Sequence, residues 1–314
     1  MRAIGFLAPG EPEVLREIDV PEPETPDVYV KIAVRAAAVN PSDVALRSGL
    51  TFARYADLPS PYIPGWDAAG TVIEAPGTAW STSDEVLAIT LPVVDGGGAY
   101  AEIIVVPAAS VVAKPASLSF AEAATIPMNG LTALLALDSA NVTTGSTVAV
   151  TGATGAVGGF AVQLAAERGA TVIADASARD TELVRSFGAT HLVQRGGDFA
   201  AQVRELFPGG VDAVIDTALL RNAGLAAVKE GGNYVGLRVP AAGGGVTAER
   251  KIHVEYPIVA SAVTNQAQLR ELVELAGSGH LTARVADVLP AAKAAEAHRR
   301  LEQGGLRGRL VLEF

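Results

Sequence analysis

Residues 147–158 read TVAVTGATGAVG, and the chain continues as GFAVQLAA to residue 166. An apolar, β-branched run stops at spaced glycines and an alanine-rich amphipathic segment follows, which predicts a strand, a turn and a helix. Gly152 permits the tight turn, Gly155 lets a pyrophosphate approach the backbone, and Gly158 allows the helix to pack closely on the strand. A phosphate would bind the free N–H groups at the positive end of the helix dipole. The stretch therefore favours a dinucleotide-binding fold over a glycine-rich loop without function.

The composition limits the classes of protein that this chain can represent. Its 314 residues, 49% of them hydrophobic, are enough for two domains with their own cores. A net charge of −10 argues against nucleic-acid and anionic-membrane partners. The chain has no cysteine, so a disulfide framework, a thiolate catalyst and cysteine-ligated zinc are excluded. The four histidines lack metal-ligand spacing and are expected at the surface or in loops: His191, His253, His280 and His298.

Residues 139–166 carry no charge and are long enough to suggest a membrane span. The glycine turn divides this stretch, so a strand followed by a helix explains it better. The N-terminus reaches Pro9, Gly10 and Glu11 too soon for a signal peptide. We therefore expect a cytoplasmic protein.

The chain before the glycine turn has the pattern of an all-β module. Short β-like runs at 28–34, 70–73, 85–90 and 100–106 are separated by glycine and proline, which predicts a compact, barrel-like arrangement. Ser119 and Glu122 then form a capping-box pattern at the start of a helix, and a second helical stretch runs through 131–137.

After the turn, strands and helices alternate. The expected strands are 171–174, 191–194, 211–215 and 233–237, with helices at 181–187 and 199–207. This alternation indicates a parallel sheet with right-handed crossovers. The last part of the chain predicts helices at 265–277 and 291–303 and a closing strand at 309–314.

Short-chain reductases have a similar Thr-Gly-Ala-Thr-Gly turn, but near the N-terminus and with a catalytic Tyr-x-x-x-Lys pair. Here the turn lies mid-chain, and no tyrosine is followed by lysine four residues later. That family is therefore rejected.

The chain instead resembles the zinc-independent medium-chain dehydrogenases/reductases, in their quinone oxidoreductase (zeta-crystallin-like) branch, over essentially its whole length. The order and spacing of several short motifs carry the resemblance: NPSD at 40–43, IPGWDAAGTV at 63–72, GAYAE at 98–102, LSFAEAA at 118–124, GLTA at 130–133, the glycine turn, RSFGA at 185–189, GGNYV at 231–235, AAEAHRRLE at 294–302 and RGRLVL at 307–312.

The resemblance implies an α/β protein with a GroES-like β-barrel catalytic domain, residues 1–120 and 258–314, and a central Rossmann domain, residues 121–257. The Rossmann domain would hold a doubly wound parallel sheet, and the active site would lie in the cleft between the domains. Zinc-containing relatives use a cysteine and usually a His-Glu segment as ligands. The matching positions here include Asn40 and Asp67, and Asp67 is expected to make a structural hydrogen bond rather than to bind a metal.

The end of the second Rossmann strand distinguishes NAD from NADP. Asp175 is a carboxylate that would favour NAD. Ser177 and Arg179 match positions where relatives bind the 2′-phosphate, and Arg195 replaces a tyrosine that commonly flanks the adenine. Arginines offset the repulsion between a carboxylate and a phosphate, so NADPH is favoured and NAD stays possible.

Candidate catalytic residues follow from the same resemblance. Asn40 and Thr132 match residues close to the nicotinamide: Asn40 would position substrate or ribose, and Thr132 the carboxamide, although a turn-forming and a helix-packing role stay open. Tyr55 and Tyr62 are alternative proton donors, or packing residues, or solvent supplies the proton. Asp43 is expected to cap the following helix.

The remaining cofactor-binding candidates come from the glycine turn and from later strand ends: Thr132, Gly152, Ala153, Thr154, Gly155, Ala156, Val157, Gly158, Thr217, Gly236, Leu237 and Arg309. Residues 216–220, DTALL, depart from the family's Asp-Thr-Val-Gly-Gly, and Leu219 and Leu220 would shape an unusual pocket.

The sequence thus predicts a zinc-free, NADPH-dependent oxidoreductase, active as a homodimer on a small quinone or α,β-unsaturated carbonyl. Two alternatives stay open: an NAD-linked dehydrogenase or reductase of a biosynthetic intermediate, and a nucleotide-binding protein with little catalytic activity.

Overall fold

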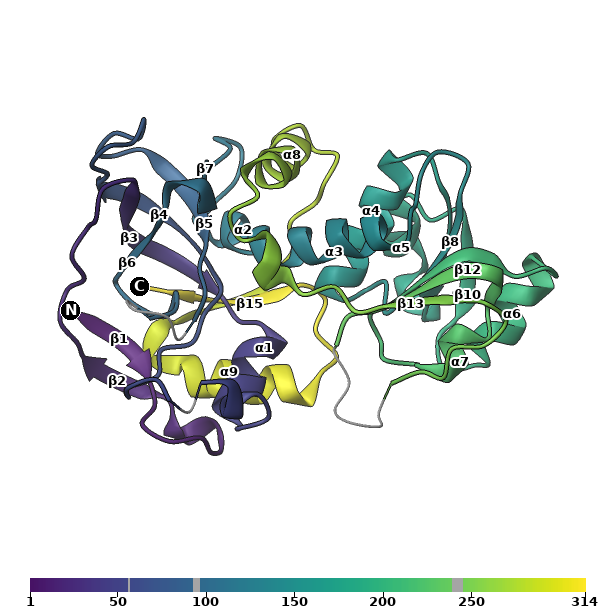
Figure 1. Cartoon of the computed structure of the whole chain (residues 1–314), viewed down its shortest axis with the longest axis horizontal. Helices are drawn as coiled ribbons and strands as arrows, with labels where there is room; N and C mark the ends of the chain where they lie inside the picture. The colour runs from purple at the N-terminus through teal and green to yellow at the C-terminus, as the bar shows by residue number, and fades with distance from the viewer. Residues whose placement is uncertain (56, 93–96, 239–244) are drawn as a thin grey trace. The chain divides into compact units, whose positions relative to one another are not determined.

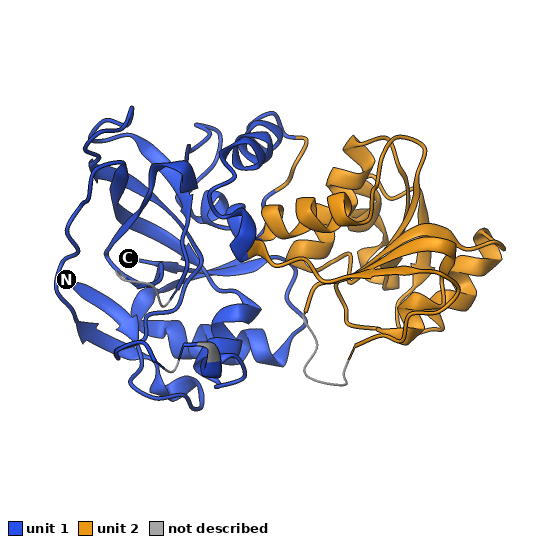
Figure 2. Ribbon diagram, viewed as in Figure 1, with its two compact units in different colours: residues 1–128, 260–279, 283–314 blue, residues 129–259, 280–282 orange. Residues whose placement is uncertain are grey.

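The computed structural model describes residues 1–55, 57–92, 97–238 and 245–314. The chain forms two compact units (Figure 2). Unit 1 comprises Met1–Met128, Ala260–Gly279 and Ala283–Phe314, and unit 2 comprises Asn129–Val259 and His280–Thr282. Both ends of the chain therefore build unit 1. The domain limits predicted from the sequence stay a prediction.

Unit 1 contains the all-β module. Its seven-stranded sheet has the order β14-β15-β3-β4-β5-β7, and β6 pairs with β3. Neighbouring strands are antiparallel except β14 and β15, which run parallel. The strands are β3 (Tyr29–Ala38), β4 (Asp67–Glu74), β5 (Glu85–Ile89), β6 (Ile103–Pro107), β7 (Val111–Ala113), β14 (Val285–Pro290) and β15 (Arg309–Glu313).

Alternate residues of these strands fill one hydrophobic core, in which Val30, Ile32, Val72 and Leu310 are buried. A separate antiparallel pair, β1 (Arg2–Gly5) and β2 (Arg16–Asp19), packs its apolar residues into the same core. The helices of unit 1 are α1 (Pro41–Arg47), α2 (Phe120–Ala124), α8 (Gln266–Gly277) and α9 (Ala294–Gln303).

Unit 2 holds a six-stranded sheet in the order β10-β9-β8-β11-β12-β13, and every pair in it is parallel (Figure 1). Chain order reverses between β8 and β11, which is the topological switch point of a doubly wound fold. The strands are β8 (Thr147–Thr151), β9 (Thr171–Ala176), β10 (His191–Gln194), β11 (Val211–Asp216), β12 (Val228–Gly236) and β13 (His253–Glu255).

Helices connect these strands, as the alternating pattern predicts. They are α3 (Pro127–Ser139), which leads from unit 1 into unit 2, α4 (Ala156–Glu167), α5 (Thr181–Ser186), α6 (Phe199–Leu206) and α7 (Asn222–Leu225). The predicted combination of a GroES-like β module and a Rossmann-type parallel sheet is confirmed. Ser119 accepts a hydrogen bond from the Glu122 N–H and caps α2, also as predicted.

Several predicted boundaries differ from the structure. The strand expected at 233–237 begins at Val228, because Gly231 and Gly232 lie within β12 at a register shift against β11 rather than before the strand. The helix expected from residue 291 begins at Ala294, after a 3-10 turn at Ala291–Lys293. The sequence pattern did not predict strand β14. The strand expected at 100–106 begins only at Ile103.

Within the described ranges, no helix combines the length and the hydropathy needed to cross a membrane.

Candidate active site

The glycine turn lies between β8 and α4, as predicted. Gly152 has a φ of +66°, which a residue with a Cβ adopts only under strain. A Cβ at position 158 would lie 2.2 Å from the Gly152 carbonyl oxygen. A Cβ at position 155, the N-cap of α4, would lie 3.1 Å from that same oxygen. The turn is therefore a bare backbone cradle, and each glycine has its own steric reason.

The first N–H groups of α4, on Ala156, Val157 and Gly158, have no carbonyl one turn earlier to receive them. Gly155 offers no side-chain cap in their place. These donors at the positive end of a twelve-residue helix fit the phosphates of a dinucleotide. Ala153 and Thr154 are buried, and the Ala153 N–H donates to Asp175 Oδ1 at 2.9 Å. Ala153 therefore fixes the carboxylate instead of offering its N–H to a phosphate.

The predicted specificity residues gather at the ends of β9 and β10. Arg195 Nε donates to Asp175 Oδ2 at 2.9 Å, and Asp175 is buried. Ser177 donates its hydroxyl to Asp180, and Arg179 is largely exposed, with its Nε 4.0 Å from that carboxylate. The negative charge of Asp175 is thus paired with the Arg195 guanidinium, while the Arg179 guanidinium lies at the surface.

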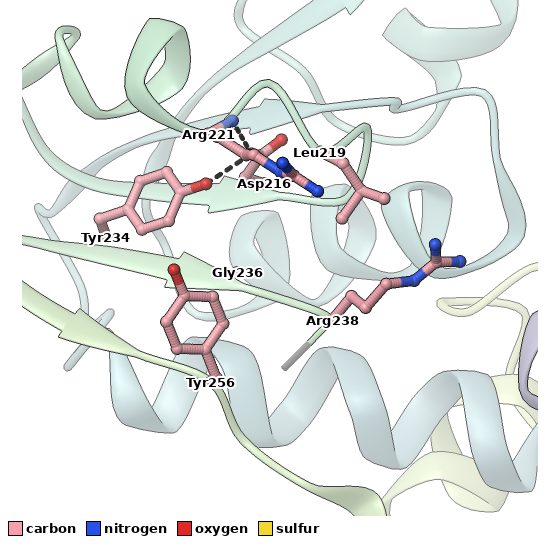
Figure 3. Close-up of a pocket in the computed structure, with 7 residues that line it drawn as sticks. All are labelled: Asp216, Leu219, Arg221, Tyr234, Gly236, Arg238 and Tyr256. Carbon is pink, nitrogen blue, oxygen red and sulfur yellow. Dashed lines mark hydrogen bonds between the residues drawn. The ribbon is translucent and has the colours of Figure 1, made fainter. Parts of the chain in front are cut away.

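The next two strand ends carry the other predicted residues of unit 2. Thr217 follows β11 and donates its hydroxyl to the Thr151 carbonyl at 2.6 Å. Gly236 ends β12, and a Cβ there would lie 2.6 Å from the Tyr256 ring. Leu237 follows and is half-buried. Figure 3 shows that Gly236 lies beside a pocket at these strand ends.

The loop after β11 contains two strained residues, and one of them, Leu219, lies at a position where the resemblance led us to compare the chain with glycine. Leu219 has a φ of +61° and Arg221 a φ of +56° with a ψ of −122°. Side chains with a Cβ rarely adopt these conformations. Asp216 stabilises the loop by accepting the Leu220 N–H at 3.0 Å and the Arg221 N–H at 2.7 Å. The loop is therefore strained and held by one carboxylate. Of the two leucines expected to shape a pocket, Leu219 lines the pocket at these strand ends.

Unit 1 contains a buried polar cluster around Asn40. Asn40 Nδ2 donates to Asp67 Oδ1 at 2.8 Å, and the Met128 N–H donates to Asp67 Oδ2 at 3.0 Å. Asp67 therefore makes the structural hydrogen bonds expected of it. Asp43 accepts the Asn40 N–H at 2.8 Å and the Gly65 N–H at 2.9 Å. It thus caps α1 as expected, but as the third residue of that helix, while Asn40 is the N-cap. Asn40 Oδ1 is buried and has no hydrogen-bond partner among the residues the structure describes.

Sequence reasoning missed two members of this cluster, Tyr100 and His298. Tyr100 OH lies 3.2 Å from His298 Nε2 and 3.4 Å from Asp43 Oδ2. The prediction that His298 lies at the surface or in a loop is wrong: it is fully buried on α9. The alternation of apolar and polar residues in α9 could have indicated an inward-facing position.

Burial dominates the electrostatics of this cluster. It raises the pKa of Asp43 and of Asp67 to about 7, against 3.8 for an ordinary aspartate. Burial lowers the pKa of Arg309 to about 10, although both carboxylates oppose this shift. It also lowers the pKa of His298 to about 3, so the imidazole is neutral. Arg309, predicted to bind cofactor, thus lies on β15 among the carboxylates of unit 1.

The remaining catalytic candidates have different surroundings. Tyr62 is buried, its ring contacts those of Phe6 and Phe52, and its hydroxyl donates to the Leu58 carbonyl at 3.0 Å. These contacts favour the packing interpretation for Tyr62. Tyr55 is half-buried against the same core, and Thr132 is half-buried on α3 in unit 2. In the part of the chain that the structure describes, no group of three His, Asp or Glu side chains could hold a metal ion.

Comparisons with known proteins agree with this architecture. A model described as the alcohol dehydrogenase GroES-like domain matches residues 26–116, and one described as zinc-binding dehydrogenase matches residues 187–312. An NAD-dependent alcohol dehydrogenase of Saccharolobus solfataricus is 30% identical, and the alignment covers 99% of both chains. The chain belongs to the medium-chain dehydrogenase/reductase family. It is therefore an oxidoreductase of a family that uses nicotinamide cofactors.

Two further members of the family are informative. The NADPH-dependent alkenal/one oxidoreductase, chloroplastic, of Arabidopsis thaliana is 34% identical over 76% of this chain and 62% of its own length. The quinone oxidoreductase of Coxiella burnetii has a solved structure with a TM-score of 0.85, 31% identity, and coverage of 100% of this chain and 99% of that one. The chain spans about three fifths of the length of the curated reductases it matches.

Proposed function

We propose that this protein is an NADPH-dependent reductase that transfers hydride to a quinone or an α,β-unsaturated carbonyl without zinc. The glycine turn before α4 carries the proposal, because its exposed backbone and the helix N-terminus fit a pyrophosphate. The names of two similar proteins, an NADPH-dependent alkenal/one oxidoreductase and a quinone oxidoreductase, support this substrate class.

The choice of NADPH rests on the Asp175–Arg195 ion pair. A free carboxylate at this strand end accepts the ribose hydroxyls of NAD and repels a 2′-phosphate. Here the Arg195 guanidinium balances that charge, with its Nε 2.9 Å from Asp175 Oδ2. The Ala153 N–H donates to the other carboxylate oxygen. Ser177 directly follows the strand and the exposed Arg179 lies two residues later. Arg179 would donate to the phosphate, and Ser177 would do so only by releasing its hydrogen bond to Asp180.

The chain's own residues position the reactants and move a proton. A bound reduced nicotinamide supplies the hydride, which adds to the β-carbon of an enone or to a quinone while one proton completes the reduction. Asn40 holds its Nδ2 on Asp67, so its unpartnered Oδ1 is an acceptor. An acceptor fits a ribose hydroxyl better than a developing oxyanion, which needs donors. Thr132 would fix the carboxamide, and Tyr55 or solvent would donate the proton.

The zinc-free part of the proposal rests on the donor set. The positions that match zinc ligands are Asn40 and Asp67, and these two side chains bond to each other. A single carboxylate without cysteine or histidine beside it is a poor zinc site. Dialysis against EDTA should therefore leave the turnover rate unchanged, and a loss restored by Zn²⁺ would contradict this part.

The first experiment is a turnover assay at 340 nm with NADPH and NADH as donors and 1,4-benzoquinone and but-3-en-2-one as acceptors. The proposal predicts consumption of NADPH with at least one acceptor and slower consumption of NADH. A preference for NADH would favour the NAD-linked alternative, which Asp175 supports. Tight NADPH binding without consumption would favour a nucleotide-binding protein with little catalysis.

We also propose a cytoplasmic homodimer. Strand β13 is the last strand of the six-stranded sheet, so its outer edge could pair with a second copy. Light scattering of the purified protein tests the oligomeric state.

A further inference from the structure

A small pocket opens at the carboxyl ends of β11 and β12, within unit 2. Its volume is about 20 Å³, and its lining consists of Asp216, Leu219, Arg221, Tyr234, Gly236, Arg238 and Tyr256. This space takes about one water-sized polar group. Figure 3 shows the side chains of Arg221 and Arg238 on the side of the pocket where Leu219 lies, opposite the two tyrosine rings.

Both arginines lack a partner for the guanidinium within the described part of the chain. Among the residues the structure describes, neither guanidinium has an ion pair or a hydrogen bond, although Arg221 and Arg238 are exposed and the chain carries a net charge of −10. Two cations that line one small pocket repel each other unless an anion lies between them. Their shared position therefore favours an anionic ligand.

The carboxylate in the pocket wall does not serve as that anion. Asp216 is fully buried and accepts hydrogen bonds from Thr151 Oγ1 at 2.7 Å and Tyr234 OH at 2.5 Å. It also accepts the backbone N–H groups of Leu220 and Arg221. Four donors thus satisfy Asp216, and two of them fix the backbone from which the Arg221 side chain extends. The guanidinium remains available for a ligand.

The place of the pocket in the sheet suggests which ligand brings the charge. The glycine turn follows β8, and the residues proposed to hold the adenosine end, Asp175 and Arg195, lie at β9 and β10 on one side of β8. Strands β11 and β12 lie on the other side. A dinucleotide across this sheet would put its nicotinamide end toward β11 and β12, where the reducible substrate must approach.

We propose that Arg221 and Arg238 bind an acidic group, a carboxylate or sulfonate, of the carbonyl substrate. The inference rests on the proposed function and narrows its substrate class to acidic acceptors. A planar guanidinium binds such a group through paired N–H donors, and the pocket has room for one oxygen of that group. The arginines would thus determine specificity without touching the reacting atoms.

The test compares 1,4-naphthoquinone with 1,4-naphthoquinone-2-sulfonate in the wild type, R221Q and R238Q. We expect the ratio of kcat/KM for the sulfonated over the plain quinone to fall by about tenfold or more in each variant, since a charge-assisted hydrogen bond is lost. R221G removes the same cation and also the left-handed strain, so a folding defect cannot explain its result. R16Q, which removes an exposed arginine of β2, should leave the ratio unchanged. An unchanged ratio in R221Q, R221G and R238Q overturns the proposal.

A binding experiment separates this proposal from the proposed function. Titration calorimetry with benzoate needs no turnover, and it should show saturable binding to the wild type that R221Q and R238Q weaken by about tenfold. Benzoate binding equal in all variants overturns the acidic subsite even if the enzyme reduces quinones. A matching loss of NADPH affinity in R221Q would assign the arginines to the cofactor and likewise overturn it. Absence of turnover with intact benzoate binding would instead contradict the proposed function.

Discussion

Arg195 Nε lies 2.9 Å from Asp175 Oδ2, so the carboxylate at the end of β9 carries its own counter-charge. The two residues come from neighbouring parallel strands and meet because β9 and β10 pair in register, with Val193 opposite Asp175. An acidic residue at this place is usually a sign of NAD. Under the proposed function, the ion pair removes the repulsion that would otherwise exclude a 2′-phosphate.

Replacing Arg195 by alanine should therefore change the cofactor preference. In R195A the carboxylate is unopposed, and we expect NADPH affinity to fall by about tenfold or more while NADH affinity changes less than about threefold. Fluorescence titration of both reduced cofactors measures the two dissociation constants. R185A removes an exposed arginine of α5 in the same unit and serves as the control. An equal loss for both cofactors would argue against the role assigned to the ion pair.

The buried carboxyls of unit 1 make stability depend on pH. The pKa of Asp67 is about 7 in the folded protein and near 3.8 in the unfolded chain. Between these values the folded state holds more protons, so the free energy of unfolding falls as pH rises from about 4 to about 7. D67N has no carboxyl to titrate at this position, so its free energy of unfolding does not fall with pH for this reason. The stability of D67N relative to the wild type should therefore rise between pH 5 and pH 8.

Urea unfolding at those two pH values measures the difference. D287N is the control, because Arg300 lowers the pKa of Asp287 and its titration falls below the tested window. A stability difference between D67N and the wild type that stays constant with pH would contradict the raised pKa.

The strain in the loop predicts that glycine at position 219 is more stabilising than alanine, the reverse of the usual order. Alanine normally stabilises a protein relative to glycine, but at a φ of +61° its Cβ is strained. L219G should therefore be more stable than L219A by about 1 kcal/mol, since both variants lose the same leucine side chain. The pair L220G and L220A, at a residue without positive φ, should show the ordinary order. Thermal unfolding of the four variants decides the matter, and the ordinary order at both positions would show that Leu219 is unstrained.

Much of the fold was predictable because its signals are local. The glycine spacing at 152, 155 and 158 and the alternation of apolar runs predicted the parallel sheet of unit 2 and the start of α4. Ser119 with Glu122 predicted the cap of α2 for the same reason. Each of these features depends on residues only a few positions apart.

The features that were missed depend on contacts between distant residues. His298 is buried because Tyr100, almost two hundred positions earlier, packs against it in the core of unit 1. The pairing of Asp175 with Arg195 requires the register of β9 and β10, which no local pattern encodes. The path of β12 through Gly231 depends on the strand beside it, since a bulge forms only against a partner.

The central claim is that a reduced nicotinamide dinucleotide binds on the bare turn before α4. The most direct test is NADPH titration of G155A, because a methyl group at this N-cap meets only the Gly152 oxygen at 3.1 Å and otherwise projects where the pyrophosphate would bind. G209A adds a methyl group in open space and is the matched control. We predict that G155A weakens NADPH binding by about tenfold or more while keeping the wild-type unfolding temperature, and that G209A changes neither. Wild-type NADPH affinity in folded G155A would contradict the account.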